Sequence, residues 1–139
     1  MKQFFCLLTI LLLTQCGRDL EVNLGNEYYY TSEGRQRTYI CKWNNKNHIA
    51  STFVVMPSIQ EYAYDNNFIL VYRLITFQME KFYADAEDDL WNKQKGDNVQ
   101  FWIIEKKNDK VYGPLKKDNF KQLKDSLKIS EHLKLDEAQ

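Results

Sequence analysis

The chain has 139 residues, of which 44% are hydrophobic, 14% aromatic and 27% charged, with 19 basic and 19 acidic side chains. These values predict one globular domain with a real core. They exclude collagen-like, cysteine-dense and low-complexity chains. The balanced charge lacks the strong positive field of nucleic-acid-binding proteins, so no nucleic-acid partner is expected.

The first fifteen residues have the features of a secretory signal peptide. Lys2 gives a positive start, and an apolar run of ten residues follows from Phe4 to Leu13. A membrane-spanning helix needs roughly 20 apolar residues, so this run is too short to cross a bilayer. It fits the hydrophobic region of a signal peptide, and residues 1–15 are therefore expected to be removed.

The sequence Leu13-Thr14-Gln15-Cys16 resembles the lipobox of bacterial lipoproteins, in which the cysteine directly follows the cleavage point. Gln15 stands where that family usually has a small residue. The resemblance implies that Cys16 is lipidated and anchors the protein to a membrane of the bacterial cell envelope, on its periplasmic or extracellular face. Two or more acyl chains give stable anchoring, whereas one does not. An ordinary signal peptide cut near Cys16 is the alternative.

The mature chain is expected to contain a single domain over 19–129. A lipidated N-terminus with a short linker at 16–18 precedes this domain, and a frayed tail at 130–139 follows it. Alternating polar and apolar residues at 19–24 predict a strand that begins almost at the membrane.

Further β-rich runs predict most of the remaining domain. Strands are expected at 28–31, 37–43, 51–56, 59–64, 68–76, 99–106 and 110–112. Turn formers at 65–67 lie between two such runs and predict a hairpin. The run at 68–72 is apolar on both faces, which predicts a central strand that is covered on both sides. Gly113 and Pro114 are expected to break the last strand.

Two segments have helical periodicity. The stretch from Phe77 to Lys95 predicts one helix on the sheet. Its apolar positions at three- and four-residue spacing are Met79, Phe82, Tyr83, Ala86 and Leu90. A second helix is expected at 116–128, poorly capped by Lys116, with Phe120 on one face and lysines on the other. That lysine face is interpreted as solubilising, and contact with anionic lipid is the alternative.

The predicted fold class is therefore α+β. We expect a single small antiparallel sheet of five to seven strands. A C-terminal helix and one further helix would pack on this sheet.

The C-terminal half carries a second resemblance. Phe101-Trp102-Ile103-Ile104 and Val111-Tyr112-Gly113-Pro114-Leu115 are followed by the lysine-rich helix, and the hairpin around 62–71 precedes them. With the lipobox, these features resemble a family of small bacterial lipoproteins of unknown function. The likeness covers the lipobox, residues 62–71 and residues 99–127. It implies an envelope lipoprotein with a compact sheet-plus-helix domain, and it implies no activity.

The cysteines and histidines give little support for a disulfide, a catalytic nucleophile or a metal site. Cys6 would leave with the signal peptide and Cys16 would take lipid, so Cys41 is left without a disulfide partner. We interpret Cys41 as a buried thiol in a strand, and a nucleophile paired with His48 is the alternative. His132 falls in the expected tail. So few ligands predict no metal site, and no cofactor is expected.

The carboxylates show no recognisable catalytic or metal-binding pattern. The acidic cluster consists of Asp85, Glu87, Asp88 and Asp89. It lacks the glycine and glutamate spacing of a calcium loop, so we interpret it as a solvated helix face. A glycosidase pair would need two carboxylates at a defined separation, which spacing in sequence does not show. The carboxylates considered for such a pair include Glu61, Asp65 and Glu80.

Aromatic residues form the main candidate binding surface. They are Tyr28, Tyr29, Tyr30, Trp43, Tyr62 and Tyr64. The three consecutive tyrosines must alternate between the faces of a strand. These residues either pack both faces of the sheet or line a surface for an envelope protein, a peptide or a glycan.

The sequence therefore favours a membrane-anchored envelope lipoprotein that acts as a non-catalytic binding module. One alternative is a small envelope enzyme that uses carboxylates. Another is an inhibitor or immunity-type lipoprotein that occupies a partner's site.

Overall fold

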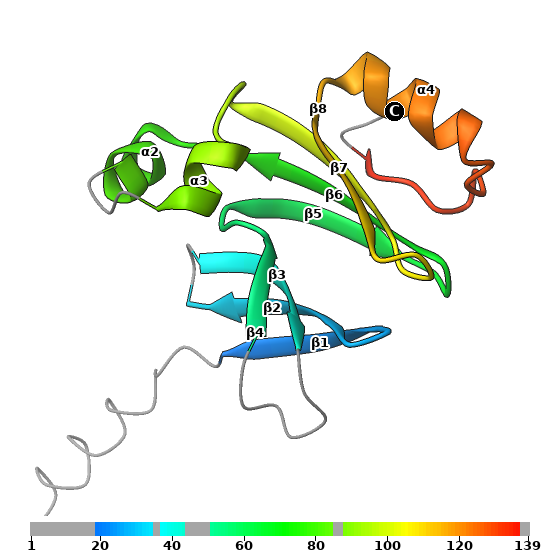
Figure 1. Cartoon of the computed structure of the whole chain (residues 1–139), viewed down its shortest axis with the longest axis horizontal. Coiled ribbons are helices and arrows are strands. Elements are labelled where there is room, and N and C mark those ends of the chain that lie inside the picture. Colours follow the sequence, from blue (N-terminus) through cyan, green and yellow to red (C-terminus); the bar gives the residue numbers. More distant parts are fainter. Residues whose placement is uncertain (1–18, 35–36, 44–50, 85–87, 137–139) are drawn as a thin grey trace, which may run out of the picture.

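The computed structural model describes residues 19–34, 37–43, 51–84 and 88–136 (Figure 1). These residues form two four-stranded antiparallel sheets and three helices, which confirms the α+β class. The N-terminal sheet contains β1 (Leu20–Gly25), β2 (Tyr28–Glu33), β3 (Arg37–Trp43) and β4 (Ser51–Val55). The C-terminal sheet contains β5 (Ile59–Tyr64), β6 (Phe68–Leu74), β7 (Val99–Glu105) and β8 (Lys110–Leu115). The helices are α2 (Phe77–Ala84), α3 (Asp89–Gln94) and α4 (Lys117–Ser126).

The strands divide into two sheets instead of the single sheet expected from the sequence. The chain leaves β4 through Met56, Pro57 and Ser58, all of which are buried. Ser58 has a φ of 91°, its amide donates to the carbonyl of Thr38 at 3.1 Å, and its hydroxyl donates to the carbonyl of Leu74. This connection fixes the change of direction that sends β5 into the second sheet.

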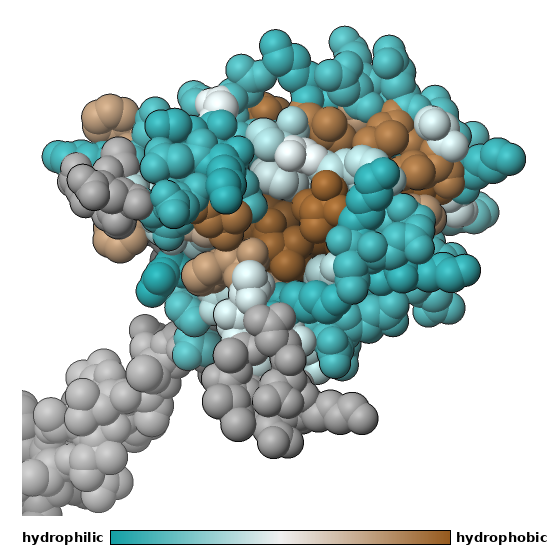
Figure 2. Space-filling model, viewed as in Figure 1, coloured by the Kyte–Doolittle hydropathy of each residue, from teal (hydrophilic) through white to brown (hydrophobic). Residues whose placement is uncertain are grey.

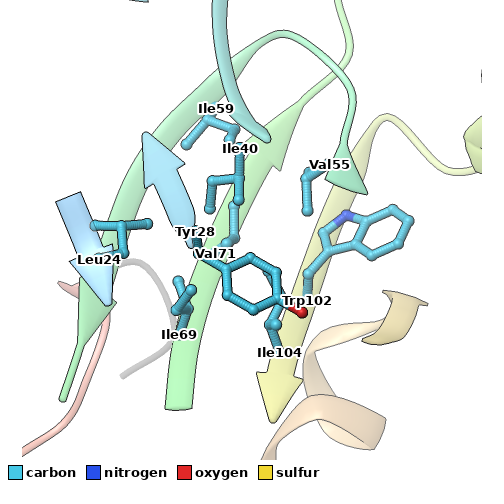
Figure 3. Packing of buried hydrophobic residues seen from close by; sticks show 9 residues of the cluster. All are labelled: Leu24, Tyr28, Ile40, Val55, Ile59, Ile69, Val71, Trp102 and Ile104. Carbon is cyan, nitrogen blue, oxygen red and sulfur yellow. The ribbon is translucent and has the colours of Figure 1, made fainter. Parts of the chain in front are cut away.

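The two sheets face each other across the main core (Figure 3). The N-terminal sheet contributes Leu24, Tyr28, Ile40 and Val55, and the C-terminal sheet contributes Ile59, Ile69, Val71, Trp102 and Ile104. Adjacent residues Ile69, Leu70 and Val71 on β6 are all 0% exposed. The prediction of a central strand covered on both faces is therefore confirmed.

Helix α4 and the segment that follows it cover the other face of the C-terminal sheet (Figure 1). Phe120 of α4 lies 5.1 Å from Phe101 of β7, measured between ring centroids. Leu133 and Leu135 are 7% and 1% exposed and belong to the same cluster. The expected frayed tail is thus wrong as far as residue 136, because these leucines complete an apolar cluster that α4 alone does not fill. Lys116 makes no side-chain cap bond, as predicted for the start of α4.

The single helix expected over Phe77–Lys95 is two short helices, α2 and α3. The Asp88 side chain accepts from the amide of Trp91 at 2.9 Å, so a new helix starts there with its own N-cap. Tyr83 of α2 stacks on Trp91 of α3 with ring centroids 4.9 Å apart. Phe82 was expected on the buried face but is 62% exposed, because Tyr83 occupies the inward position.

Strand β8 continues through Gly113 and Pro114, which were expected to break it. Its pairing with β7 shifts register between Phe101 and Ile103, and this irregularity accommodates the two residues. A Cβ atom at Gly113 would lie 2.2 Å from the Trp102 ring, so only glycine allows this close approach. In the described part of the chain, no helix is both long and apolar enough to span a membrane.

Candidate binding site

The six candidate aromatic residues do not form one surface. Tyr28 is 1% exposed, lies in the core between the sheets, and donates through its hydroxyl to Asp109 at 3.1 Å. Tyr29 points to the opposite face of β2, where it meets Trp43 edge-on with ring centroids 6.3 Å apart. Tyr28, Tyr29 and Trp43 thus pack the two faces of the N-terminal sheet. This is the first of the two arrangements that the sequence left open for the aromatic residues.

Three other tyrosines come together in space. Tyr30 of β2 stacks on Tyr62 of β5 with ring centroids 4.3 Å apart, and Tyr62 lies 6.3 Å from Tyr64 at an interplanar angle of 24°. We call these three residues the tyrosine row. Tyr62 and Tyr64 share one face of β5 because they are two positions apart. Tyr30 and Tyr62 are half-buried, whereas Tyr64 is 44% exposed.

A cavity of about 360 Å³ lies at the Tyr30 end of the row. Among the residues that the structure describes, its polar lining consists of uncharged side chains, from Thr38, Ser58, Gln60, Thr76 and Gln78. Hydroxyl and amide groups both donate and accept hydrogen bonds. This end of the row can therefore hold a polar ligand without a formal charge.

A second cavity, of about 740 Å³, lies at the Tyr64 end between the β1–β2 and β5–β6 turns. Asn23, Asn26 and Asn66 line it together with Asp65 and Lys106. The two charged residues have opposite signs, so this end of the row is also close to neutral. The cavity is built from turns that lie far apart in the sequence.

Lys106 is an unusual feature of this second cavity. The residue is only 3% exposed, and its ammonium donates to the carbonyl of Leu24 at 2.5 Å. The same ammonium lies 5.7 Å from the centre of the Tyr64 ring. Burial lowers the pKa of Lys106, and the charge of Asp65 works in the opposite direction. Lys106 thus holds the β1–β2 turn against the end of the row.

The phenol groups of Tyr30 and Tyr62 are donors at neutral pH. Burial raises the pKa of Tyr30 and of Tyr62 above the ordinary value for tyrosine, and in Tyr62 the neighbouring Tyr30 and Tyr64 add to that effect. Each protonated phenol presents one hydrogen to donate and an oxygen that accepts.

Cys41 has the environment of a structural residue. It is 2% exposed on β3, and its sulfur lies 3.8 Å from the Thr31 hydroxyl. Burial raises the pKa of its thiol, which disfavours the nucleophilic thiolate. The predicted buried thiol is confirmed. His48 lies outside the described residues, and His132 is exposed.

The acidic candidates are spread over separate elements. Asp88 caps α3 and Asp89 is exposed, while Asp85 and Glu87 lie outside the described residues. Within the described ranges, no group of three or more His, Cys, Asp or Glu residues is placed to hold a metal ion.

The carboxylates considered for a glycosidase pair have other partners or lie at the surface. Asp65 accepts from the amides of Asn67 and Phe68 at 2.7 and 2.8 Å, which closes the β5–β6 turn. Glu61 accepts from the amide of Asp136 at 2.6 Å. Glu80 is exposed on α2.

Sequence reasoning missed Arg73, which is 0% exposed on β6. Its guanidinium donates to the carbonyl of Pro57 at 3.0 Å and to the side chain of Gln100 at 3.0 Å, and it lies 5.2 Å from the Trp91 ring. Burial lowers its pKa to about 10, so it stays charged at neutral pH. The signal was present in the alternation of β6, which places Arg73 on the same face as Val71. Its contacts are structural, because they join α3 to the sheet.

Residues 25–139 match a family of proteins of unknown function, DUF3997. The chain belongs to the DUF3997 family. The match covers all of the tyrosine row and every described residue from β2 onward, and it confirms the expected membership of an uncharacterised family. The segment Leu13-Thr14-Gln15-Cys16, which resembles a lipobox, precedes the matched residues. No curated protein and no solved structure matches this DUF3997 chain.

Proposed function

We propose that this DUF3997 protein is a lipid-anchored bacterial envelope lipoprotein whose domain binds a neutral glycan along the tyrosine row. The observation that carries the binding proposal is the row itself, because three stacked rings connect two polar cavities. The signal-like run from Phe4 to Leu13 and the adjacent Cys16 support the anchor.

The chemistry of the row favours a sugar chain over a charged ligand. Sugar rings have apolar C–H faces that stack on aromatic side chains, and hydroxyl edges that need both donors and acceptors. The exposed Tyr64 offers such a face. The cavity at Tyr30 offers uncharged hydroxyls and amides, and the cavity at Tyr64 offers three asparagines. A glycan that spans both cavities would use all of these groups.

The anchor would allow a site with weak affinity to hold a glycan. Stacking on one exposed ring is worth only about 1 kcal/mol. An acylated Cys16 would hold many copies of the domain at one membrane surface. A glycan with many repeats then meets several copies, and the combined attachment exceeds the single-site affinity.

The binding proposal is tested by calorimetric titration with soluble oligosaccharides of glucose and of N-acetylglucosamine. Tyr64→Ala should weaken binding about tenfold, the equivalent of a little over 1 kcal/mol. Tyr29→Ala is the matched control, since Tyr29 is on the same sheet as Tyr30 but on its other face. The proposal is refuted if no oligosaccharide binds, or if both variants bind as the natural chain does.

The anchor is tested separately. The intact mass of protein extracted from membranes should equal residues 16–139 plus acyl chains. Cys16→Ser should move the protein out of the membrane fraction. A Cys16→Ser variant that partitions into membranes like the natural chain would contradict the lipoprotein assignment.

A further inference from the structure

Helix α2 exposes two large aromatic side chains. Phe77 is 79% exposed and Phe82 is 62% exposed, which are the highest values among the large hydrophobic residues of the described chain. Figure 2 shows apolar side chains that protrude among hydrophilic ones at the left edge of the molecule, where Figure 1 places α2. Two exposed phenylalanines on one short helix are a candidate contact surface.

The two exposed phenylalanines lie at the two borders of the outer face of α2. At about 100° per residue, Phe77 and Phe82 are about 140° apart around the helix, and Lys81 and Gln78 lie between them. The opposite face carries Tyr83, which is 7% exposed and packs on Trp91. Tyr83 therefore fixes the rotation of the helix. This outer face therefore combines two aromatic rings with Gln78 and the cation Lys81, and both aromatic and lysine side chains are found at membrane–water interfaces.

The same end of the molecule carries the first residues of the domain. A cavity lies between α2 and the start of β3. Its lining includes Arg37 of β3 and Met79 and Phe82 of α2. Arg37 pairs with Glu33 at the end of β2, and the neighbouring Ser32 pairs with Leu20 at the start of β1. In Figure 1 the start of β1 and α2 both lie toward the left of the domain, with β1 at the bottom and α2 at the top. Leu20 is itself 54% exposed.

The distance along the chain from the proposed anchor is short. Only Gly17, Arg18 and Asp19 separate Cys16 from Leu20. Even a fully extended chain spans at most about 3.6 Å per residue, so Leu20 lies within about 14 Å of the lipidated cysteine. A domain tethered this closely keeps the end that contains Leu20 next to the bilayer.

We propose that α2 rests on the membrane that holds the Cys16 anchor, with Phe77 and Phe82 inserted at the level of the lipid headgroups. This inference rests on the proposed lipidation of Cys16. Arg37 already pairs with Glu33 at 3.5 Å, and Glu80 offsets Lys81, so the contact depends on apolar insertion more than on attraction to anionic lipid. Because the anchor keeps α2 at the surface, a contact too weak to bind alone is sufficient.

The experiment uses the full mature protein extracted from membranes, with acylation of Cys16 established by intact mass. The protein is reconstituted into phosphatidylethanolamine–phosphatidylglycerol vesicles that contain a photoactivatable phospholipid. Crosslinked peptides are then identified by mass spectrometry. Crosslinks should concentrate on α2 and be absent from β8 and α4.

Matched variants test the role of the side chains. Phe77→Ser with Phe82→Ser should remove most of the α2 crosslinks while the protein stays folded and anchored, since both side chains are exposed. Val111→Ser is the control, because Val111 is 40% exposed on β8. Acylated protein that crosslinks on α4 instead, or not at all on α2, overturns this inference alone. An unacylated mass overturns the anchor and the inference together.

Discussion

Two phenylalanines on helices provide a direct test of how this domain is held together. Phe120 of α4 is 1% exposed and contacts Phe101 in the apolar cluster between α4 and the C-terminal sheet, whereas Phe82 of α2 is 62% exposed. Replacement by alanine removes the same atoms from a helix in both cases. Intrinsic helix preference therefore changes equally, and the difference between the two variants reports burial.

The expected magnitudes differ widely. Phe120→Ala should lower the free energy of unfolding by about 3–5 kcal/mol, because it removes a buried ring and leaves a cavity. Phe82→Ala should change it by no more than about 0.5 kcal/mol. Domains of this size are stabilised by only about 5–15 kcal/mol in total, so the first variant loses a large part of its stability.

Urea unfolding followed by tryptophan fluorescence and circular dichroism measures both values, and coincidence of the two probes checks that unfolding is two-state. The packing account is refuted if the two variants have the same stability. It is also refuted if Phe120→Ala costs less than about 1 kcal/mol, since α4 would then be held by other contacts.

Three further predictions concern other parts of the domain. Deletion of 129–139 removes the buried Ile129, Leu133 and Leu135; at about 1.5–3 kcal/mol for each side chain, the truncated chain should be largely unfolded by circular dichroism. Gly113→Ala places a Cβ atom 2.2 Å from the Trp102 ring and should lower the thermal midpoint clearly, whereas Gly34→Ser, with open space around it, should have a smaller effect. Burial raises the pKa of the Tyr28 and Tyr39 phenols above their ordinary value of 10.0. The unfolded chain loses these protons at lower pH than the folded chain, so stability should fall as pH rises above about 10, and less steeply in Tyr28→Phe.

The strands were predicted well because alternation and turn-forming residues are properties of neighbouring positions in the sequence. Turn formers at 65–67 separate two β-rich runs, and they form the β5–β6 hairpin. The apolar run at 68–72 became the covered strand β6, since a strand with no polar face needs a layer on each side. The periodicity of α4 placed Phe120 inward, as found.

The errors lie where distant residues decide the outcome. The prediction that a strand ends at Pro57 was correct. The residues next to Pro57 in the sequence gave no sign that the following strand belongs to a second sheet. Phe82 fits a helical stripe as well as Tyr83 does, and only the stacking of Tyr83 on Trp91 decided which one turned inward. The polar segment after α4 resembles a tail until Leu135 is placed against the sheet.

The candidate site shows the same division. Composition singled out the tyrosines, because consecutive aromatic residues in a strand are easily recognised. The sequence did not predict which tyrosines contact one another, because Tyr30 and Tyr62 become neighbours only when the two sheets pack face to face. Lys106 could not be linked to the β1–β2 turn, because the two lie about eighty positions apart in the chain.

The sequence by itself determined the element types, the signal-like N-terminus and the free cysteine, because alternation, apolar run length and residue counts are properties of neighbouring positions. The tertiary structure alone decided the division into two sheets, the partners of Arg73, the tyrosine row and the exposure of α2. Each of these depends on contacts between segments far apart in the chain. Such contacts are selected by the burial of apolar surface over the whole domain, which is non-directional and leaves no fixed spacing in the sequence.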